Sequence, residues 1–259
     1  MMDSQVIRYA VQDGLAVITL NRPEVMNALN ARVCADLASA LRRAAQEARA
    51  VVLTGAGRAF CSGQDLSEAA GAGAFDAESV LRDTYDPMML ALMECPVPVI
   101  AAVNGPAAGA GASIALSADV VIAAESAYFL QAFARIGLIP DAGATWWLPR
   151  QVGLPRAMGM ALFADRIPAR QAADWGLIWE AVPDEAFATH WQARARSLAQ
   201  GPTEALRRTK VALRAADVNS HAEQLALEAR LQGESARTWD FAEGVAAFVQ
   251  KRPARFEGR

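Results

Sequence analysis

Histidine, cysteine and runs of basic residues are all scarce in this chain of 259 residues. The three cysteines form no CxxC pair, and both histidines lie far from them along the chain, so the sequence predicts neither a disulfide framework nor a metal site. The formal net charge is −3 and no stretch is strongly basic, which argues against nucleic acid as a partner.

The sequence also lacks the pattern of a secretory leader or a membrane helix. Its first residues, MMDSQVIRYAVQDG, show no basic start followed by an apolar core. Residues 95–118 carry no charge, but Asn, Gly and Pro interrupt them. Their helical part is only about a dozen residues, whereas a membrane helix needs about 20. We therefore expect a cytoplasmic protein with free cysteines and no membrane partner.

This uncharged stretch has the order of a buried strand, a glycine turn and a buried helix. Residues 97–103 are rich in valine and isoleucine, which is typical of a strand buried on both faces in a parallel sheet. Residues 107–118 favour a helix with almost no bulky side chains, so that a ligand could approach its first turn closely. The free N–H groups of such a turn attract negative charge.

The glycines of this stretch could also serve tight packing alone, an alternative that the sequence leaves open. Gly109-Ala110-Gly111 resembles the start of a dinucleotide-binding fingerprint as well. Ile114 stands where the third glycine belongs, however, which excludes that site.

The remainder predicts a mixed α/β core followed by helices. We expect a hairpin at 5–20, a helix at 27–48, a strand at 50–53, a helix at 78–94, strands at 120–124 and 127–130, helices at 155–163 and 168–175, and a strand at 177–182. A small, polar loop at 57–75 leaves a strand end, where α/β folds place ligand contacts. We divide the chain into a core at 1–183 and a helical subdomain at 184–259.

Four motifs in order give the chain a specific resemblance. They are NRPEVMNALN, GAGRAFCSGQDL, PVPVIAAVNGPAAGAGASIALSADVVIAAESAYF and GLIPDAGATWWLPRQVG, and together they resemble the enoyl-CoA hydratase/isomerase, or crotonase, family over nearly the whole chain. Within the family, FLQAFARIGLIPD, TWWLPR, WGLIWE and EGVAAFVQKRPARFEG are most similar to phenylacetate-pathway isomerases that act on ring-1,2-epoxyphenylacetyl-CoA.

The resemblance implies an α/β fold, a crotonase-like spiral of ββα units whose helical C-terminal part serves trimerisation. It implies homotrimers or dimers of trimers, and a small-molecule acyl-CoA substrate. Coenzyme A would enter as part of the thioester, with no permanently bound cofactor. Two backbone N–H groups hold the thioester oxygen in this family, and the matching positions are Ser62 and Ala110. Fixed donors of this kind typically contribute about 3 kcal/mol each to lowering the barrier.

The chain departs from the family's hydratases where they carry two glutamates. The matching positions hold Ser113 and Phe133, so efficient hydration is not expected, because adding water needs a base and an acid. Asp141 matches the catalytic aspartate of several isomerase branches, and a lone carboxylate can carry a proton between two carbons. Phe133, Ile139 and Trp146 should raise the pKa of Asp141 by desolvation. The alternative is that Asp141 only caps the following helix.

Further substrate contacts are carried over from the family's motifs. They are expected at Gly63, Gln64, Asp65, Leu66, Gly109, Ser113, Phe133, Ile139, Trp146, Lys251 and Phe256. The last two would reach the nucleotide end of coenzyme A, across a subunit interface. Cys61 lies in the candidate ligand loop and could be a reactive thiol, although no histidine stands near it in the sequence.

We therefore predict an acyl-CoA isomerase acting on an unsaturated or ring-epoxide, phenylacetyl-derived thioester, with Asp141 as the proton carrier. One alternative is an enoyl-CoA hydratase of fatty-acid or aromatic degradation that recruits water through Asp141 alone. Another is a non-catalytic member of the family that binds coenzyme A or RNA, against which the acidic balance counts.

Overall fold

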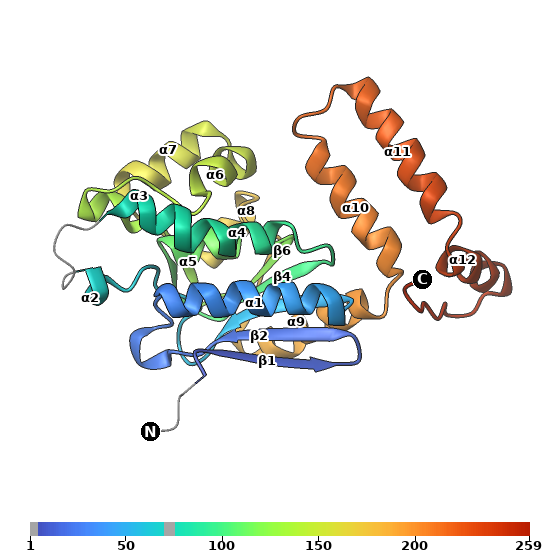
Figure 1. The fold of residues 1–259 in the computed structure, drawn as a ribbon, viewed down its shortest axis with the longest axis horizontal. Helices are drawn as coiled ribbons and strands as arrows, with labels where there is room; N and C mark the ends of the chain where they lie inside the picture. The colour runs from blue at the N-terminus through green and yellow to red at the C-terminus, as the bar shows by residue number, and fades with distance from the viewer. Residues whose placement is uncertain (1–4, 70–75) are drawn as a thin grey trace.

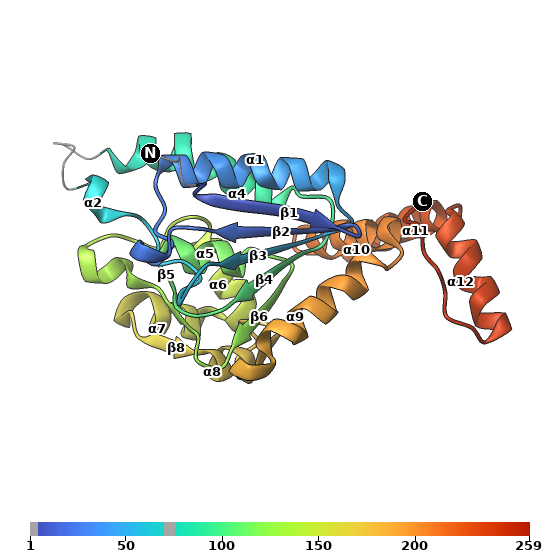
Figure 2. The same cartoon turned by 90° about the horizontal axis from the view of Figure 1, so that it is seen from below.

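The computed structural model describes residues 5–69 and 76–259, and its main layer is a twisted sheet with the strand order β1-β2-β3-β4-β6-β9 (Figures 1 and 2). The strands are β1 (Ile7–Gln12), β2 (Leu15–Leu20), β3 (Ala50–Gly55), β4 (Val99–Val103), β6 (Val120–Ala124) and β9 (Glu180–Val182). β1 and β2 form the predicted antiparallel hairpin, with Tyr9 opposite Ile18. All other neighbours in this sheet are parallel.

Helices cover both faces of this sheet. α1 (Ala31–Glu47) and α4 (Asp86–Met93) pack together on one face, and α9 (Asp184–Ala199) lies on the other. Alternate residues of β3 therefore enter different hydrophobic clusters, since Val51 and Leu53 face the α1 side and Val52 faces α9. Burial on both sides explains why β3 and β4 are continuous apolar runs in the sequence.

The remaining helices and 3₁₀ or π turns connect these layers. They are η1 (Pro23–Val25), α2 (Leu66–Ala69), α3 (Ala77–Val80), η2 (Leu81–Tyr85), η3 (Ala132–Ile136), α6 (Ala144–Val152), α7 (Leu154–Phe163) and α8 (Ala169–Asp174). The helix predicted at 78–94 forms as α3, η2 and α4 in direct succession, with a π-helical turn at η2. The Asn30 side chain caps α1 by accepting a hydrogen bond from the Val33 N–H at 3.0 Å.

A small second sheet holds the buried helix α5 (Ala110–Leu116) beside the main sheet. It has the order β5-β7-β8, with β5 (Ala107–Ala108), β7 (Tyr128–Leu130) and β8 (Arg166–Pro168). The strand predicted at 127–130 is therefore confirmed as β7, but it pairs here and not in the main sheet. Every residue of α5 is buried, as its lack of bulky and charged side chains predicts.

The C-terminal part is helical from Asp184 onward, but its first helix belongs to the core. α9 packs on the main sheet, with Phe187 and Ala195 in the cluster that fills this face. The helices that project from the body are α10 (Thr203–Ala215), α11 (His221–Ser235) and α12 (Trp239–Gln250), seen in orange and red in Figures 1 and 2. The division placed at residue 184 thus falls one helix before the projecting part. Within 5–69 and 76–259, the helices are all too short or too polar to cross a membrane.

Candidate active site

The loop that follows β3 runs directly beside the start of α5. The Ala108 N–H donates a hydrogen bond to the Cys61 carbonyl oxygen at 2.9 Å. Gly63 has φ +92°, and a Cβ atom there would lie 2.8 Å from the Ala108 oxygen and 3.4 Å from the Ala110 nitrogen. A side chain at position 63 would therefore have to displace backbone, so the close approach of the two segments requires glycine.

α5 is held against this loop by its own glycine. A Cβ atom on Gly111 would lie 2.4 Å from the Cys61 carbonyl oxygen and 2.7 Å from its Cβ. The glycines of this stretch do serve tight packing, as one interpretation of the sequence held. The packing in turn brings the backbone N–H groups of the loop and of α5 to neighbouring positions.

The free backbone donors of the loop differ from those that the sequence predicted. The Ser62 N–H donates to the Met26 carbonyl oxygen at 3.0 Å, so it is not a free donor for a ligand. The N–H groups of Gln64 and Ala110, in contrast, make no hydrogen bond within the described part of the chain. Gln64, two residues after the position that the sequence indicated, is therefore a free donor in the described part of this loop. Only the structure identifies this donor, because it depends on which N–H groups are already hydrogen-bonded to neighbouring segments.

Asp141 lies just before α6. The residue at the cap position of α6 is Gly143, and no side chain of the described residues caps this helix, so the alternative role of Asp141 as a helix cap is wrong. The Asp141 Oδ1 atom is buried, and among residues 5–69 and 76–259 it has no hydrogen-bond partner. Burial raises the pKa of Asp141 to about 6, as the sequence led us to expect.

A cavity of about 520 Å³ opens at Asp141. Its lining is mostly apolar and comes from the loop before α6, from α3, η2 and the start of α4, and from the loop after β3. The lining residues are Gln64, Ala77, Glu78, Val80, Leu81, Arg82, Asp86, Leu138, Ile139, Pro140, Asp141 and Ala142. The cavity thus joins the residue that carries the free loop N–H to the unpaired carboxylate.

Ser113 and Phe133 both lie close to Gly109. The Ser113 hydroxyl is fully buried and donates to the Asp141 carbonyl oxygen at 3.0 Å, with the Gly109 carbonyl oxygen at 3.3 Å. The Phe133 ring is buried and lies 3.8 Å from the position of a Cβ atom on Gly109. Neither side chain can act as a carboxylate, and Ser113 instead fixes the backbone of Asp141 to α5.

The structure places only some of the other residues predicted near the acyl group at the cavity. Ile139 lines the cavity, while Leu66 is half exposed at the start of α2. Asp65 forms an ion pair with Arg22 at 2.9 Å. Trp146 is not part of the cavity lining described above, and it packs edge-on against Trp147 and under the Arg150 guanidinium.

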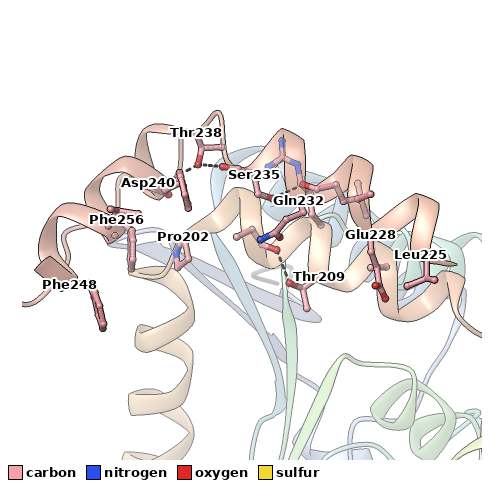
Figure 3. A pocket seen from close by; sticks show the side chains of 18 residues that line it. Pro202, Thr209, Leu225, Glu228, Gln232, Ser235, Thr238, Asp240, Phe248 and Phe256 are labelled. Atoms are coloured by element: carbon pink, nitrogen blue, oxygen red, sulfur yellow. Dashed lines mark hydrogen bonds between the residues drawn. The ribbon is translucent and has the colours of Figure 1, made fainter.

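Lys251 and Phe256 lie in the projecting helical part, away from this cavity. Lys251 follows α12 and is exposed. Phe256 lines a groove of about 850 Å³ between α10, α11 and α12, where its ring packs on Gly244 (Figure 3). In one chain these two residues do not reach the surroundings of Asp141, so their contact with coenzyme A across a subunit interface stays a prediction.

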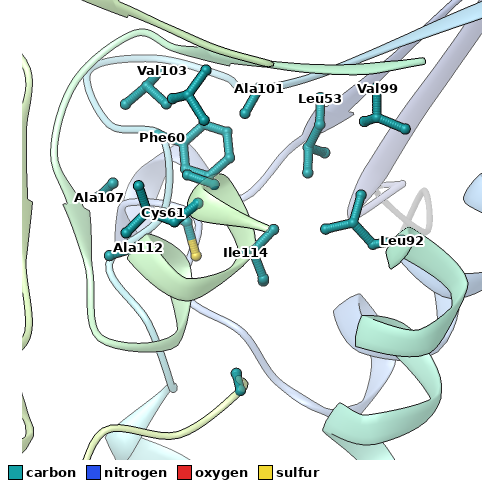
Figure 4. Close-up of a cluster of buried hydrophobic side chains, with 14 of the residues drawn as sticks. Leu53, Phe60, Cys61, Leu92, Val99, Ala101, Val103, Ala107, Ala112 and Ile114 are labelled. Carbon is teal, nitrogen blue, oxygen red and sulfur yellow. The ribbon is translucent and has the colours of Figure 1, made fainter. Parts of the chain in front are cut away.

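Cys61 is not a nucleophile in this fold. Its side chain points into the core beside Phe60, Ala112 and Ile114 (Figure 4). The thiol donates to the Asn27 carbonyl oxygen at 3.2 Å, and burial raises its pKa to about 12. No cluster of metal-binding side chains occurs among the described residues, and His190 bonds to Glu180 on the surface of α9.

Known proteins resemble this chain over its full length. The model for the enoyl-CoA hydratase/isomerase family matches residues 10–259. The chain is 62% identical over 258 residues, 100% of both proteins, to a probable enoyl-CoA hydratase of Rhodobacter capsulatus. It is 45% identical over 254 residues to the 1,2-epoxyphenylacetyl-CoA isomerase of Escherichia coli, covering 96% of this chain and 97% of that one. A crystal structure described as a putative enoyl-CoA hydratase/isomerase from Mycobacterium abscessus superposes with a TM-score of 0.94 at 39% identity, covering 98% of this chain and 100% of that one.

Proposed function

The chain belongs to the enoyl-CoA hydratase/isomerase family and has the crotonase fold, and on that premise we propose that this acyl-CoA enzyme is an isomerase. Asp141 would remove a proton from a carbon near the thioester and return it to another carbon. The observation that carries the proposal is the Asp141 carboxylate at the cavity: its Oδ1 atom is buried without a hydrogen-bond partner in the described part of the chain, and positions 113 and 133 supply no second carboxylate.

The unpaired state of Asp141 suits a general base. A carboxylate with a pKa of about 6 is ionised at neutral pH and is still a stronger base than an exposed aspartate. When it takes the proton, the electron pair of the C–H bond moves toward the thioester carbonyl oxygen. The conjugate acid then returns the proton to the other end of the delocalised system. One group is enough for both steps, whereas hydration needs a separate activated water.

The developing negative charge on the thioester oxygen requires fixed donors. Within the described part of the chain, the N–H groups of Gln64 and Ala110 are unused donors at the junction of the loop with α5. Each such donor typically contributes about 3 kcal/mol to transition-state stabilisation. Coenzyme A then enters as part of the substrate, and the proposed reaction needs no resident cofactor.

The acyl group that we propose is unsaturated or a ring epoxide derived from phenylacetate. A cavity of about 520 Å³ lined by Leu138, Ile139 and Leu81 has the size and apolar character that an aromatic acyl group requires. The relative at 45% identity is named for such a substrate. We further propose assembly as a homotrimer or a dimer of trimers, in which Lys251 and Phe256 meet the nucleotide end of the bound thioester.

Hydrogen exchange tests the role of Asp141 directly. Deuterium entry from D₂O into the α- and γ-carbons of unsaturated and aryl acyl-CoAs is measured by mass spectrometry for wild type and Asp141→Asn. We expect wild type to exchange or isomerise a substrate, and Asp141→Asn to lose at least about 100-fold in rate, as for removal of a general base. Asp174→Asn, at an exposed aspartate of α8, is the matched control and should behave as wild type. Equal rates for wild type and Asp141→Asn would refute the proposal.

Hydratase activity is the second candidate, because the relative at 62% identity is named a probable enoyl-CoA hydratase. The same three proteins are assayed for hydration of crotonyl-CoA. Rapid hydration by wild type that is lost in Asp141→Asn would favour a hydratase that positions water through Asp141 alone. Isomerisation without hydration would exclude it.

A further inference from the structure

The motif NRPEVMNALN has no part in the proposed chemistry, yet the candidate loop is built against it. Asn27 is buried and has φ +57°, a conformation that asparagine tolerates better than most residues. Its carboxamide nitrogen lies 2.9, 2.8 and 3.2 Å from the carbonyl oxygens of Ala56, Ala59 and Phe60. The segment from Arg22 to Asn30 therefore holds the chain that leads from β3 into the loop.

The same segment fixes the backbone on both sides of Gln64. The Leu29 N–H donates to the Gly63 carbonyl oxygen at 2.8 Å, and the Asp65 N–H donates to the Leu29 carbonyl oxygen at 2.8 Å. In this parallel bridge the flanking groups face Leu29, so the N–H of Gln64 points away from it and is left unused. The direction of the Gln64 N–H thus depends on how firmly residues 63 and 65 are held.

An ion pair between Arg22 and Asp65 joins the segment at 22–30 to the loop. Arg22 Nη2 lies 2.9 Å from Asp65 Oδ2, with side chains only 18% and 10% exposed. The other terminal nitrogen of Arg22 donates to the Ala28 carbonyl oxygen at 2.8 Å, while Asp65 Oδ1 accepts the Ser67 hydroxyl at 2.6 Å. A partly buried pair whose two members each make a further hydrogen bond restricts the loop more than an exposed pair would.

We propose that Arg22 and Asp65 are positioning residues, whose ion pair keeps the Gln64 N–H directed at the thioester oxygen. This inference rests on the proposed function, because it assigns the two residues to the geometry of the oxyanion donors. Both side chains bind protein groups, and neither belongs to the lining of the cavity at Asp141 given above. The family motif that begins with Asn21 is thereby connected to catalysis through the loop that it holds.

The proposal predicts that loosening the loop lowers kcat much more than it weakens substrate binding. A donor to the thioester oxygen stabilises the transition state more than the bound substrate, since the charge on that oxygen grows during the reaction. Loosening the loop should lower kcat about 10- to 100-fold, as small misplacements of catalytic groups do. The dissociation constant of the thioester should change by less than about threefold, because most of its binding surface is untouched.

The test compares Arg22→Met and Asp65→Asn with Arg43→Met. Asp65→Asn keeps the size of the side chain and an oxygen for Ser67. Arg43→Met removes an exposed ion pair of the same 2.9 Å length, formed with Glu47 within α1, and should leave every readout at its wild-type value. For each protein we measure kcat, the dissociation constant, thermal unfolding, and the infrared C=O stretch of bound ¹³C-carbonyl cinnamoyl-CoA.

In wild type the bound carbonyl stretch should move to lower frequency than in water, and in the two loop variants most of this movement should be lost together with kcat. A full shift in both folded variants, or unchanged kcat in both, overturns the positioning role. If Arg22→Met fails to fold, Asp65→Asn decides by the same readouts. Absence of the shift in wild type itself would instead refute the oxyanion donors, and with them the proposed function.

Discussion

Asp141 lies in an energetically unfavourable environment, which the proposed reaction explains. Burial raises the pKa of Asp141 to about 6, and in the described part of the chain its buried Oδ1 atom has no hydrogen-bond donor. Ser113, whose hydroxyl could have supplied one, donates to backbone carbonyl oxygens of Asp141 and Gly109 instead. A carboxylate left in this state keeps its basicity at the expense of folding stability.

This cost predicts a pH-dependent stability difference. The folded-state pKa of Asp141, about 6, lies above its ordinary value of 3.8, so the folded chain binds the proton more tightly than the unfolded chain. The resulting stabilisation is present in full below pH 3.8 and is lost as the pH rises through 6. Asp141→Asn should therefore unfold at higher urea than wild type at pH 8, by at most about 3 kcal/mol. At pH 4 the two should be nearly equal, and Asp174→Asn should show no such pattern. A difference independent of pH would contradict the desolvation of Asp141 as its cause.

At the scale of elements, the site depends on how closely α5 packs against the loop after β3. The contact is backbone to backbone, since Gly111 faces the Cys61 carbonyl oxygen and Gly63 faces the Ala108 carbonyl oxygen. Side chains of ordinary size at these two positions would separate the loop from α5, and with it the N–H groups of Gln64 and Ala110.

Gly111→Ala should therefore lower both stability and activity. The new methyl group would meet backbone at 2.4 Å, and forced overpacking of this kind costs about 1–3 kcal/mol. Gly159→Ala is the matched control, because a Cβ atom on this glycine of α7 has no heavy atom within 4 Å. It should stabilise the protein by about 0.5–1 kcal/mol. Urea unfolding and turnover of an acyl-CoA substrate measure both effects, and equal behaviour of the two variants would contradict the close backbone contact.

At the scale of the whole molecule, the projecting helices are fastened at their base and apolar on their surface. Asp119 binds Lys210 at 2.7 Å and Arg214 at 2.8 Å, which ties α10 to the end of the main sheet. Buried Asp240 accepts the N–H groups of Glu257 and Gly258 and so holds the C-terminal tail on α12. Phe248 and Val249, in contrast, are 86% and 72% exposed.

The exposed apolar side chains of the projecting helices agree with the proposed assembly as a trimer or a dimer of trimers. We expect light scattering to give a mass three or six times the 27.5 kDa of one chain. Phe248→Asp should shift it toward the monomer, because a charge would be buried at a subunit contact. Val11→Asp, at an exposed position on β1, should leave it unchanged. A wild-type monomer, or an unchanged mass for Phe248→Asp, would refute the assembly.

The sequence by itself determined the fold class and the order of most elements, and it indicated Asp141 as the candidate base. Local patterns are enough for these, because alternating or continuous apolar runs specify strands and faces, and the four motifs identify the family. The exclusion of a dinucleotide site and the absence of a second carboxylate at Ser113 or Phe133 also follow from residue identity alone.

Only the tertiary structure decided which groups remain free for a ligand. Ser62 lost its predicted role because a distant segment, at Met26, uses its N–H, and Gln64 gained one because Leu29 binds the groups on either side of it. The capping role of Asp141 was excluded by the backbone at Gly143, and α9 joined the core because the sheet has a second apolar face. Each of these outcomes depends on contacts between segments far apart in the chain, and no local pattern encodes which partner a backbone group will find.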